Sequence, residues 1–403
     1  MRGAVRVVAG CAIHTIPTHD VPEGATRVYG CRVTQFDCIV VGTGGLGSAA
    51  VYHLARRGAR VLGIDQFAPP HDLGSSHGQT RIYRQAYYEA PEYVPLALRA
   101  LELWNELERE SGTRLFANTG ALTIGPERGE LFAGALLSAR RHNIAHEVLT
   151  SSECERRFPA FRAPSNTIAL FEPTGGVLFP EACVSAHLAW AQHRGAVIHT
   201  NEAVLGIDEN DAYVAVRAST ASYTAARVIV AAGAWAPKLI GRANAFAVTR
   251  ETVHWFAAAS SSARGNACPV SMIAHDDGPI LYTIPDFGNG FKAGRHHAGR
   301  VAEPTQSKAP ADADDARVTT ELMQRFVPGG AGKLIESAPC YYTTTRDHHF
   351  AIGPLPAAPR IILASACSGH GFKFASALGE SVAKLALQQD AGLPASLFDV
   401  GRL

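Results

Sequence analysis

Three glycines in the run GTGGLG are the residues best suited to bind a charged ligand. Gly42, Gly44 and Gly47 fit the pattern G-x-G-x-x-G. The first glycine permits a tight turn, the second lets the backbone approach a pyrophosphate, and the third lets a helix pack on a strand. Asp65 follows 23 residues after Gly42, where a carboxylate can bind ribose hydroxyls. The pattern therefore predicts a dinucleotide site that suits FAD or NAD, while the acid disfavours NADP.

Two other groups of reactive side chains carry weaker predictions. Residues 74–78, GSSHG, fit the nucleophile motif G-x-S-x-G, but a loop broken by prolines precedes them where that motif requires a strand. We therefore do not expect Ser76 to be a nucleophile. The pairs His296-His297 and His348-His349 could suggest a metal, yet adjacent residues on a strand point to opposite faces. We expect no metal site.

The elements around the glycine run form a recognisable unit. An apolar strand at 36–41, a helix at 48–57 and a second strand at 60–64 predict a βαβ unit with a turn that faces phosphates. An exposed loop or helix edge is expected at 300–316, which is rich in Ala, Asp and Pro. The other expected elements are helices at 93–110, at 181–194 and from about 374, and strands at 121–124, 168–179, 196–199, 203–207, 212–217, 227–231 and 360–364.

Length and composition narrow the class of protein. A chain of 403 residues suggests two domains, and 47% hydrophobic with 18% charged residues is typical of a globular protein. The net charge of +1 gives no reason to expect nucleic acid, and no apolar run reaches the roughly 20 residues of a membrane span. Eight scattered cysteines without a C-x-x-C pair indicate reduced thiols in a cytoplasmic protein.

The first 35 residues show no convincing periodicity. Val8-Ala9-Gly10-Cys11 is similar to a lipoprotein cleavage box, but Arg6 leaves an apolar stretch shorter than the roughly 7–15 residues that an export signal needs. We expect an N-terminal extension at 1–35, either disordered or the result of a start codon placed too early.

Four later segments extend the argument. They resemble, in order, the motifs of the family that includes monomeric sarcosine oxidase, N-methyltryptophan oxidase and pipecolate oxidase. With the βαβ unit, the resemblance covers roughly residues 36–403. The segments are GSSHGQTRIYRQAY (74–87), GFKAGRHH (290–297), CYYTTTRDHHF (340–350) and SGHGFKFAS (368–376).

The resemblance implies an α/β fold. A Rossmann-like FAD-binding domain would be assembled from discontinuous segments, and a second, sheet-rich α+β domain would carry the substrate. The expected boundaries are 36–120, 180–245 and 336–403 for the FAD-binding domain, and 121–179 and 246–335 for the substrate domain.

The resemblance also assigns cofactor contacts. Cys340 matches the cysteine that family members bond through sulfur to the flavin 8α carbon, so covalent FAD is expected. That reaction needs a thiolate, which basic neighbours favour. The other positions that match flavin contacts are His77, Thr80, Arg81, His370 and Gly371.

Five positions match catalytic residues of the family. Lys292 matches a lysine over the flavin that speeds the reduction of oxygen, because a fixed cation stabilises the anion that forms first. Arg84 and Lys373 match the two cations that bind the substrate carboxylate. Tyr282 and His296 match side chains that flank the amine.

The activity implied is oxidation of a secondary amino acid to an imine by a monomer, with O2 reduced to H2O2. Gln79 stands where sarcosine oxidases usually carry Asp, so sarcosine, other N-methyl amino acids, cyclic imino acids and glycated amino acids remain open as substrates. Three alternatives also remain: an FAD dehydrogenase that passes electrons to a quinone or carrier protein, an NAD-linked dehydrogenase, and a non-catalytic flavoprotein subunit.

Overall fold

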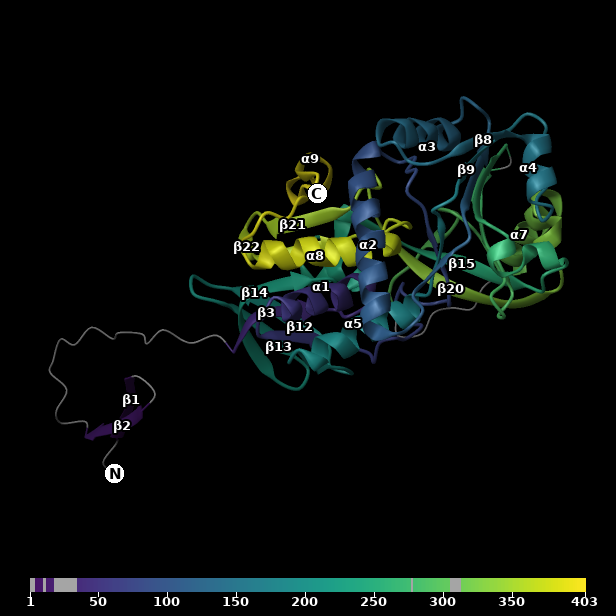
Figure 1. Cartoon of the computed structure of the whole chain (residues 1–403). Helices are drawn as coiled ribbons and strands as arrows, with labels where there is room; N and C mark the ends of the chain where they lie inside the picture. Colours follow the sequence, from purple (N-terminus) through teal and green to yellow (C-terminus); the bar gives the residue numbers. More distant parts are fainter. Residues whose placement is uncertain (1–3, 10–11, 18–34, 277, 305–312) are drawn as a thin grey trace. The chain divides into compact units, whose positions relative to one another are not determined.

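The computed structural model describes residues 4–9, 12–17, 35–276, 278–304 and 313–403 (Figure 1). The chain divides into two compact units, residues 1–35 and 36–403. In the first unit, β1 (Ala4–Ala9) pairs antiparallel with β2 (Ala12–Pro17), a feature that the sequence prediction did not include. The expected disorder of the extension otherwise concerns residues outside the described ones.

One of the two large sheets in the second unit has a parallel centre. Its strands run in the order β11-β4-β3-β14-β13-β12, and β22 pairs with the carboxyl-terminal half of β14. Strands β11, β4, β3, β14 and β22 are parallel, and the βαβ pattern predicted this for β3 and β4. The bounds are β3 (Phe36–Val41), β4 (Val61–Ile64), β11 (Val197–His199), β12 (Val204–Glu209), β13 (Val214–Ala218), β14 (Ser222–Val230), β21 (Ala351–Leu355) and β22 (Ala358–Ser365).

Four helices pack together beside this sheet (Figure 1). Apolar side chains of all four belong to one buried cluster with residues of β3 and β22. Helix α2 is buried along one face, whereas α1 and α8 are buried on nearly every side. The helices are α1 (Gly45–Arg56), α2 (Val94–Ser111), α5 (Pro180–His193) and α8 (Ala375–Ala386). Helix α1 begins directly after the glycine turn, so its free N–H groups face the end of β3.

The second large sheet has the order β19-β15-β18-β17-β16-β7-β9-β8, and β20 pairs along β15. Its strands are β7 (Ala121–Gly125), β8 (Glu147–Thr150), β9 (Ile168–Glu172), β15 (Phe246–Phe256), β16 (Val270–His275), β17 (Gly278–Ile284), β18 (Phe291–Arg295), β19 (Arg300–Val301) and β20 (Leu334–Thr345). The remaining helices of four or more residues are α3 (Glu130–Arg141), α4 (Ser151–Arg157), α6 (Ala236–Leu239), α7 (Ala313–Phe326) and α9 (Ala395–Phe398).

The second unit also contains a small third sheet of three short strands. Strand β10 (Gly176–Leu178) lies between β5 (Arg81–Tyr83) and β6 (Phe116–Asn118), antiparallel to both. It fixes the backbone of β5, which contains the predicted site residue Arg81 and lies between two others, Thr80 and Arg84.

Two predicted elements need correction. The expected strand at 168–179 is two strands in different sheets, because Pro173 to Gly175 interrupt it. The region at 300–316 contains β19 and the first turn of α7, not only an exposed loop or helix edge. Acidic residues open α7, where they suit the helix dipole, and Thr319, Leu322, Met323 and Phe326 are buried at helical spacing.

The sheets draw on the segments expected for two domains. The parallel sheet uses 36–64, 197–230 and 351–365, while the second large sheet uses 121–172 and 246–345, so β20 crosses the expected boundary at 336. The domain boundaries stay a prediction. In the part of the chain that the structure describes, we find no helix with the length and apolarity of a membrane span.

Candidate active site

A cavity of about 670 Å³ gathers residues from remote parts of the chain. Its volume lies within the range of small-molecule and cofactor sites. Of the residues predicted from the sequence, Gly47 and His77 do not line it. Those that do are Gly42, Gly44, Asp65, Thr80, Arg81, Arg84, Tyr282, Lys292, His296, Cys340, His370, Gly371 and Lys373.

The glycine turn at one end of the cavity requires its glycines. Gly42 has a φ of +86°, and a Cβ there would lie 2.7 Å from the carbonyl oxygen of Ala231. A Cβ at Gly47 would lie 1.7 Å from the carbonyl oxygen of Gly42, so this residue allows α1 to pack on the turn. Gly44 lines the cavity and presents backbone without a side chain, as close approach to a pyrophosphate requires.

Asp65 ends β4 beside this turn. Its carboxylate accepts hydrogen bonds from the backbone N–H of Thr43 at 2.7 Å and of Phe67 at 3.0 Å. These bonds fix the carboxylate at the cavity wall. The N–H of Gly45, at the start of α1, donates to Ser76 Oγ at 2.9 Å. Ser76 thus lies against the helix N-terminus in a loop, without the preceding strand that the nucleophile motif requires.

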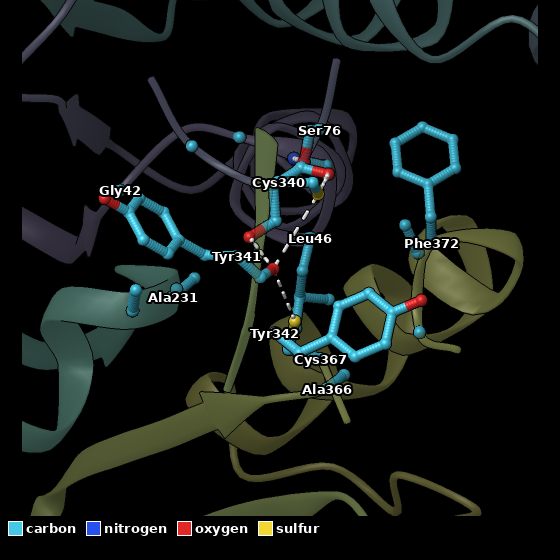
Figure 2. A pocket seen from close by; sticks show the side chains of 18 of the residues that line it. Gly42, Leu46, Ser76, Ala231, Cys340, Tyr341, Tyr342, Ala366, Cys367 and Phe372 are labelled. Atoms are coloured by element: carbon cyan, nitrogen blue, oxygen red, sulfur yellow. Dashed lines mark hydrogen bonds between the residues drawn. The ribbon is translucent and has the colours of Figure 1, made fainter. Parts of the chain in front are cut away.

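Cys340 lies on β20 and lines the cavity together with Ser76, Tyr341 and Cys367 (Figure 2). Its Sγ is 3.9 Å from the carbonyl oxygen of Ser75 and 3.8 Å from that of Tyr341. Arg81 Nη2 donates to the same Ser75 oxygen at 2.8 Å within the 74–81 loop. Ser75 Oγ donates to the Tyr341 carbonyl oxygen at 2.7 Å, which joins this loop to the strand beside the thiol. A second thiol, Cys367, lies 3.7 Å from the Tyr341 oxygen and also lines the cavity; the sequence analysis missed it.

Lys292 is a buried cation, with 2% of its surface exposed. Its Nζ donates to the carbonyl oxygens of Gly78 at 2.8 Å and Thr80 at 2.9 Å, and it lies 5.2 Å from the ring centre of Trp255. Burial lowers the pKa of the ammonium well below its usual value, and the charge of Arg81 lowers it further. The position therefore differs from an ordinary surface lysine, since two backbone dipoles stabilise the cation inside the protein.

Arg84 and Lys373 are both buried and share the ring of Tyr87. The guanidinium carbon of Arg84 lies 4.1 Å and Lys373 Nζ lies 5.1 Å from that ring centre. Arg84 Nη2 donates to both carboxylate oxygens of Glu89 at 2.7 Å, a partner that the sequence analysis missed. Lys373 Nζ donates to the carbonyl oxygen of His370 at 2.7 Å. Two basic side chains thus meet at the cavity wall, and the Glu89 carboxylate pairs with Arg84. Burial lowers the pKa of Lys373 well below its usual value, and the charge of Arg84 lowers it further.

The aromatic wall consists of Tyr282, Tyr342, His296 and His370. Burial raises the pKa of both tyrosines, and it lowers the pKa of both histidines well below the usual value. His370 Nε2 lies 3.1 Å from the carbonyl oxygen of His348, which can only accept, so Nε2 carries the proton. Its Nδ1 then accepts from the Tyr87 hydroxyl. These aromatic rings form one wall of the cavity, and burial favours the neutral form of both histidines.

The histidine pairs are not arranged as expected. His296 and His297 follow the end of β18, and their ring centres are 4.1 Å apart, so the argument from opposite faces of a strand was wrong for them. Among residues whose placement the structure describes, no group of three His, Cys, Asp or Glu side chains could hold a metal ion.

The fold and the cavity define a dinucleotide-binding flavoprotein architecture. The glycine turn, the N-terminus of α1 and Asp65 are the groups that would hold the pyrophosphate and a ribose of a dinucleotide, and Gly42, Gly44 and Asp65 line the same cavity as Cys340 and Lys292. Residues 37–385 match the DAO family, described as FAD dependent oxidoreductase. The chain belongs to this family of FAD-dependent oxidoreductases, and the sequence prediction of the family, enzyme class and fold is confirmed.

Curated relatives agree over almost the whole chain. A monomeric sarcosine oxidase of Bacillus sp. (strain B-0618) is 38% identical over 380 residues, covering 92% of this chain and 96% of that protein. An N-methyl-L-tryptophan oxidase of Yersinia pestis (strain Pestoides F) is 34% identical over 370 residues, covering 91% and 99%.

Solved structures share the fold at lower identity. NikD, an amino acid oxidase essential for nikkomycin biosynthesis, superposes with a TM-score of 0.78 at 22% identity, covering 90% of this chain and 97% of that one. L-Proline dehydrogenase from P. horikoshii gives a TM-score of 0.79 at 22% identity, covering 91% and 97%.

Proposed function

We propose that this enzyme oxidises a small secondary amino acid to an imine, using FAD bonded to Cys340 and O2 as the electron acceptor. The observation that carries the proposal is that Arg84, Lys373 and Lys292 line the same cavity as Cys340 and the glycine turn. An acid-bearing amine and an oxygen molecule each need a fixed cation at the cofactor, and this cavity contains buried cations in two separate places.

Arg84 and Lys373 form the site that binds the substrate carboxylate, and this binding orients the substrate. Arg84 offers a planar fork for bidentate binding, and Lys373 adds a second charge. In the structure, both carboxylate oxygens of Glu89 accept hydrogen bonds from Arg84 Nη2, and a carboxylate is the group that the substrate would present. Substrate binding therefore replaces one carboxylate by another, and the orientation that results accounts for most of the catalysis that the protein itself supplies.

The residues around the amine keep it reactive. The rings of His296 and His370 are neutral because burial lowers their pKa, and the nearby cations disfavour a protonated amine. The bound flavin supplies the two-electron acceptor for the amine. Lys292, held by two carbonyl oxygens, stabilises the negative charge that develops when oxygen takes its first electron. Oxygen leaves as H2O2, and the imine hydrolyses in water.

Covalent attachment and the amine oxidation can be tested separately. Denaturation of the purified protein in acid or detergent should leave yellow fluorescence on the protein band; its absence would refute attachment at Cys340. Anaerobic mixing with small secondary amino acids should bleach the flavin, and air should then produce H2O2. Bleaching without peroxide would favour the rival dehydrogenase that passes electrons to a quinone or carrier protein.

Two further parts of the proposal concern the oligomeric state and the cellular location of the protein. The relatives named as monomeric sarcosine oxidases support a monomer, which light scattering of the purified protein would test. Cytoplasmic location stays a prediction from the cysteine pattern, and fractionation of the producing cells would test it.

A further inference from the structure

The segment from Gly78 to Ala86 carries β5 and connects the two cationic sites. At each end of this segment, a buried or half-buried carboxylate accepts hydrogen bonds from backbone N–H groups. Glu181, in the first turn of α5, accepts the N–H of Gly78 at 2.7 Å and of Gln79 at 3.0 Å. Glu172, at the end of β9, accepts the N–H of Gln85 and of Ala86, each at 2.8 Å. Both acids flank β10, the strand that pairs with β5.

The Glu181 end leads to Lys292. Gly78 donates its N–H to Glu181 and offers its carbonyl oxygen to Lys292 Nζ at 2.8 Å. The turn is an unusual one, since Gly78 has a φ of +92° and the non-glycine Gln79 a φ of +68°. Left-handed conformations persist where surrounding contacts hold them, and the two bonds to Glu181 are such contacts.

At the other end of the segment, one backbone residue connects Glu172 to Arg84 in the same way. Ala86 donates its N–H to Glu172 and accepts a hydrogen bond from Arg84 Nη1 at 3.3 Å through its carbonyl oxygen. Glu172 is 1% exposed, and each of its two oxygens receives one N–H. In both cases a single residue connects a carboxylate to a cation of the active site.

We infer that Glu181 and Glu172 are positioning residues for the two cationic sites: Glu181 fixes the carbonyl groups that hold Lys292, and Glu172 fixes the backbone that holds Arg84. This inference rests on the proposed function of Lys292 and Arg84. It predicts that the two acids act on different steps, since Glu181 serves the reaction with oxygen and Glu172 serves the binding of the substrate carboxylate.

Alanine substitutions separate the two effects. Because a misplacement of about 1 Å at a catalytic group can cost about 10²-fold in rate, Glu181→Ala should slow the reoxidation of reduced flavin by oxygen by about 10-fold or more. Glu172→Ala should weaken the binding of a carboxylate by about 10-fold, which corresponds to about 1.4 kcal/mol. Each variant should leave the other measurement within about threefold of the unchanged enzyme.

Three measurements on the flavin-loaded enzyme read these effects without the natural substrate. Dithionite-reduced enzyme is mixed with oxygen, and reoxidation is followed by absorbance. Methoxyacetate, a small carboxylate with an ether oxygen in place of the amine, is titrated against the oxidised enzyme by the change in flavin absorbance. Hydrogen–deuterium exchange of peptides that cover residues 78–86 reports directly on the backbone hydrogen bonds to Glu181 and Glu172 and does not depend on activity.

Glutamine variants add a test by conservative substitution. Both N–H groups at Glu181 bind the same oxygen, Oε1, so Glu181→Gln retains the acceptor and should restore slow exchange at residues 78–79. Glu172 uses both oxygens, so Glu172→Gln places an amide against one N–H and should rescue less. If Glu172→Ala fails to fold, Glu172→Gln carries the binding test.

Glu108 gives a matched control on α2. Its Oε2 accepts hydrogen bonds from the backbone N–H of Leu115 at 2.6 Å and of Phe116 at 3.0 Å, so it also binds two consecutive N–H groups. Glu108 does not line the cavity. Glu108→Ala should change neither reoxidation nor methoxyacetate binding. Equal losses in both measurements for Glu181→Ala and Glu172→Ala, or losses no larger than those of the control, would overturn the inference.

The underlying proposal fails in a different way. Lys292→Met is measured beside the other variants. If it reoxidises as fast as the unchanged enzyme, the role proposed for Lys292 is wrong, whatever Glu181 does. If Lys292→Met is slow while Glu181→Ala is normal in both reoxidation and exchange, only the positioning role of Glu181 is wrong.

Discussion

Replacement of Lys292 by methionine tests the charge at the proposed site of oxygen reduction with little change in shape. Methionine has a similar length and fills the buried space beside Trp255, but it carries no charge and cannot donate to the oxygens of Gly78 and Thr80. We expect flavin reduction by the substrate to change little, because Arg84 and Lys373 are retained. Reoxidation by oxygen should become much slower.

The size of the loss follows from the burial of the ammonium. Lys292 is almost entirely removed from solvent, so water screens its charge weakly. At about 4 Å from an anion, with an effective dielectric constant of about 20, one charge contributes about 4 kcal/mol. Loss of that stabilisation from the rate-limiting electron transfer corresponds to a rate about 10³-fold lower.

The pH dependence gives a second, independent check. Burial lowers the pKa of Lys292 well below its usual value, and the positive charge of Arg81 lowers it further. The lysine is cationic below that lowered pKa, so reoxidation should be fast at low pH and should slow as pH rises through it. The methionine variant should lack this step.

Stopped-flow absorbance of dithionite-reduced enzyme mixed with oxygen measures both effects. A variant that reoxidises within about threefold of the unchanged enzyme, a difference below about 1 kcal/mol, would refute the role of the charge. Loss of the rate with retention of the pH step would assign the step to another group and refute the second part of the reasoning.

Three further variants test other parts of the structure. Cys340→Ser should bind FAD without the covalent bond, so the denatured protein band should lose its yellow fluorescence; retained fluorescence would place the bond elsewhere. Glu89→Gln should free the fork of Arg84 and tighten methoxyacetate binding by about 10-fold, since a charged competitor at 2.7 Å is removed; weaker binding would contradict this. Burial opposes the charge of Glu380, but its bonds to Arg99 lower its pKa to about 2, so its stabilisation is present above about pH 4.5 and lost as pH falls towards 2. Glu380→Gln should cost about 2 kcal/mol of unfolding free energy at pH 7 and much less near pH 3, measured by denaturant titration.

The sequence predicted the parts of the fold whose signals are local. The strand at 36–41, the glycine turn and the helix after it are encoded within 25 consecutive residues by apolar periodicity and by glycines, of which Gly42 and Gly47 leave no room for a side chain. The helix at 313–326 had a clear signal too, with buried residues at helical spacing, but the neighbouring Ala, Asp and Pro content concealed it. Strands of the second large sheet were harder, because their partners lie far away in the sequence.

The site residues divide in the same way. Motifs that match a family identified Lys292, Arg84, Lys373 and Cys340, and the fold brings all four to one cavity. The residues that hold them were missed, because a carboxylate that accepts backbone N–H groups has no sequence pattern. Glu181 lies 103 residues from Gly78, and only the pairing of β10 with β5 brings the two together.

Glu89 shows what the pairing of charges adds to a list of site residues. Buried cations without a partner are costly, so a seat for a substrate carboxylate must be stabilised when it is empty. Glu89 performs this role for Arg84 with two bonds of 2.7 Å and lies five residues away on the same chain segment. A substrate then gains only the difference between its own carboxylate and that of Glu89. Weak binding of simple carboxylates, with selection resting on the amine and its substituent, follows from this exchange.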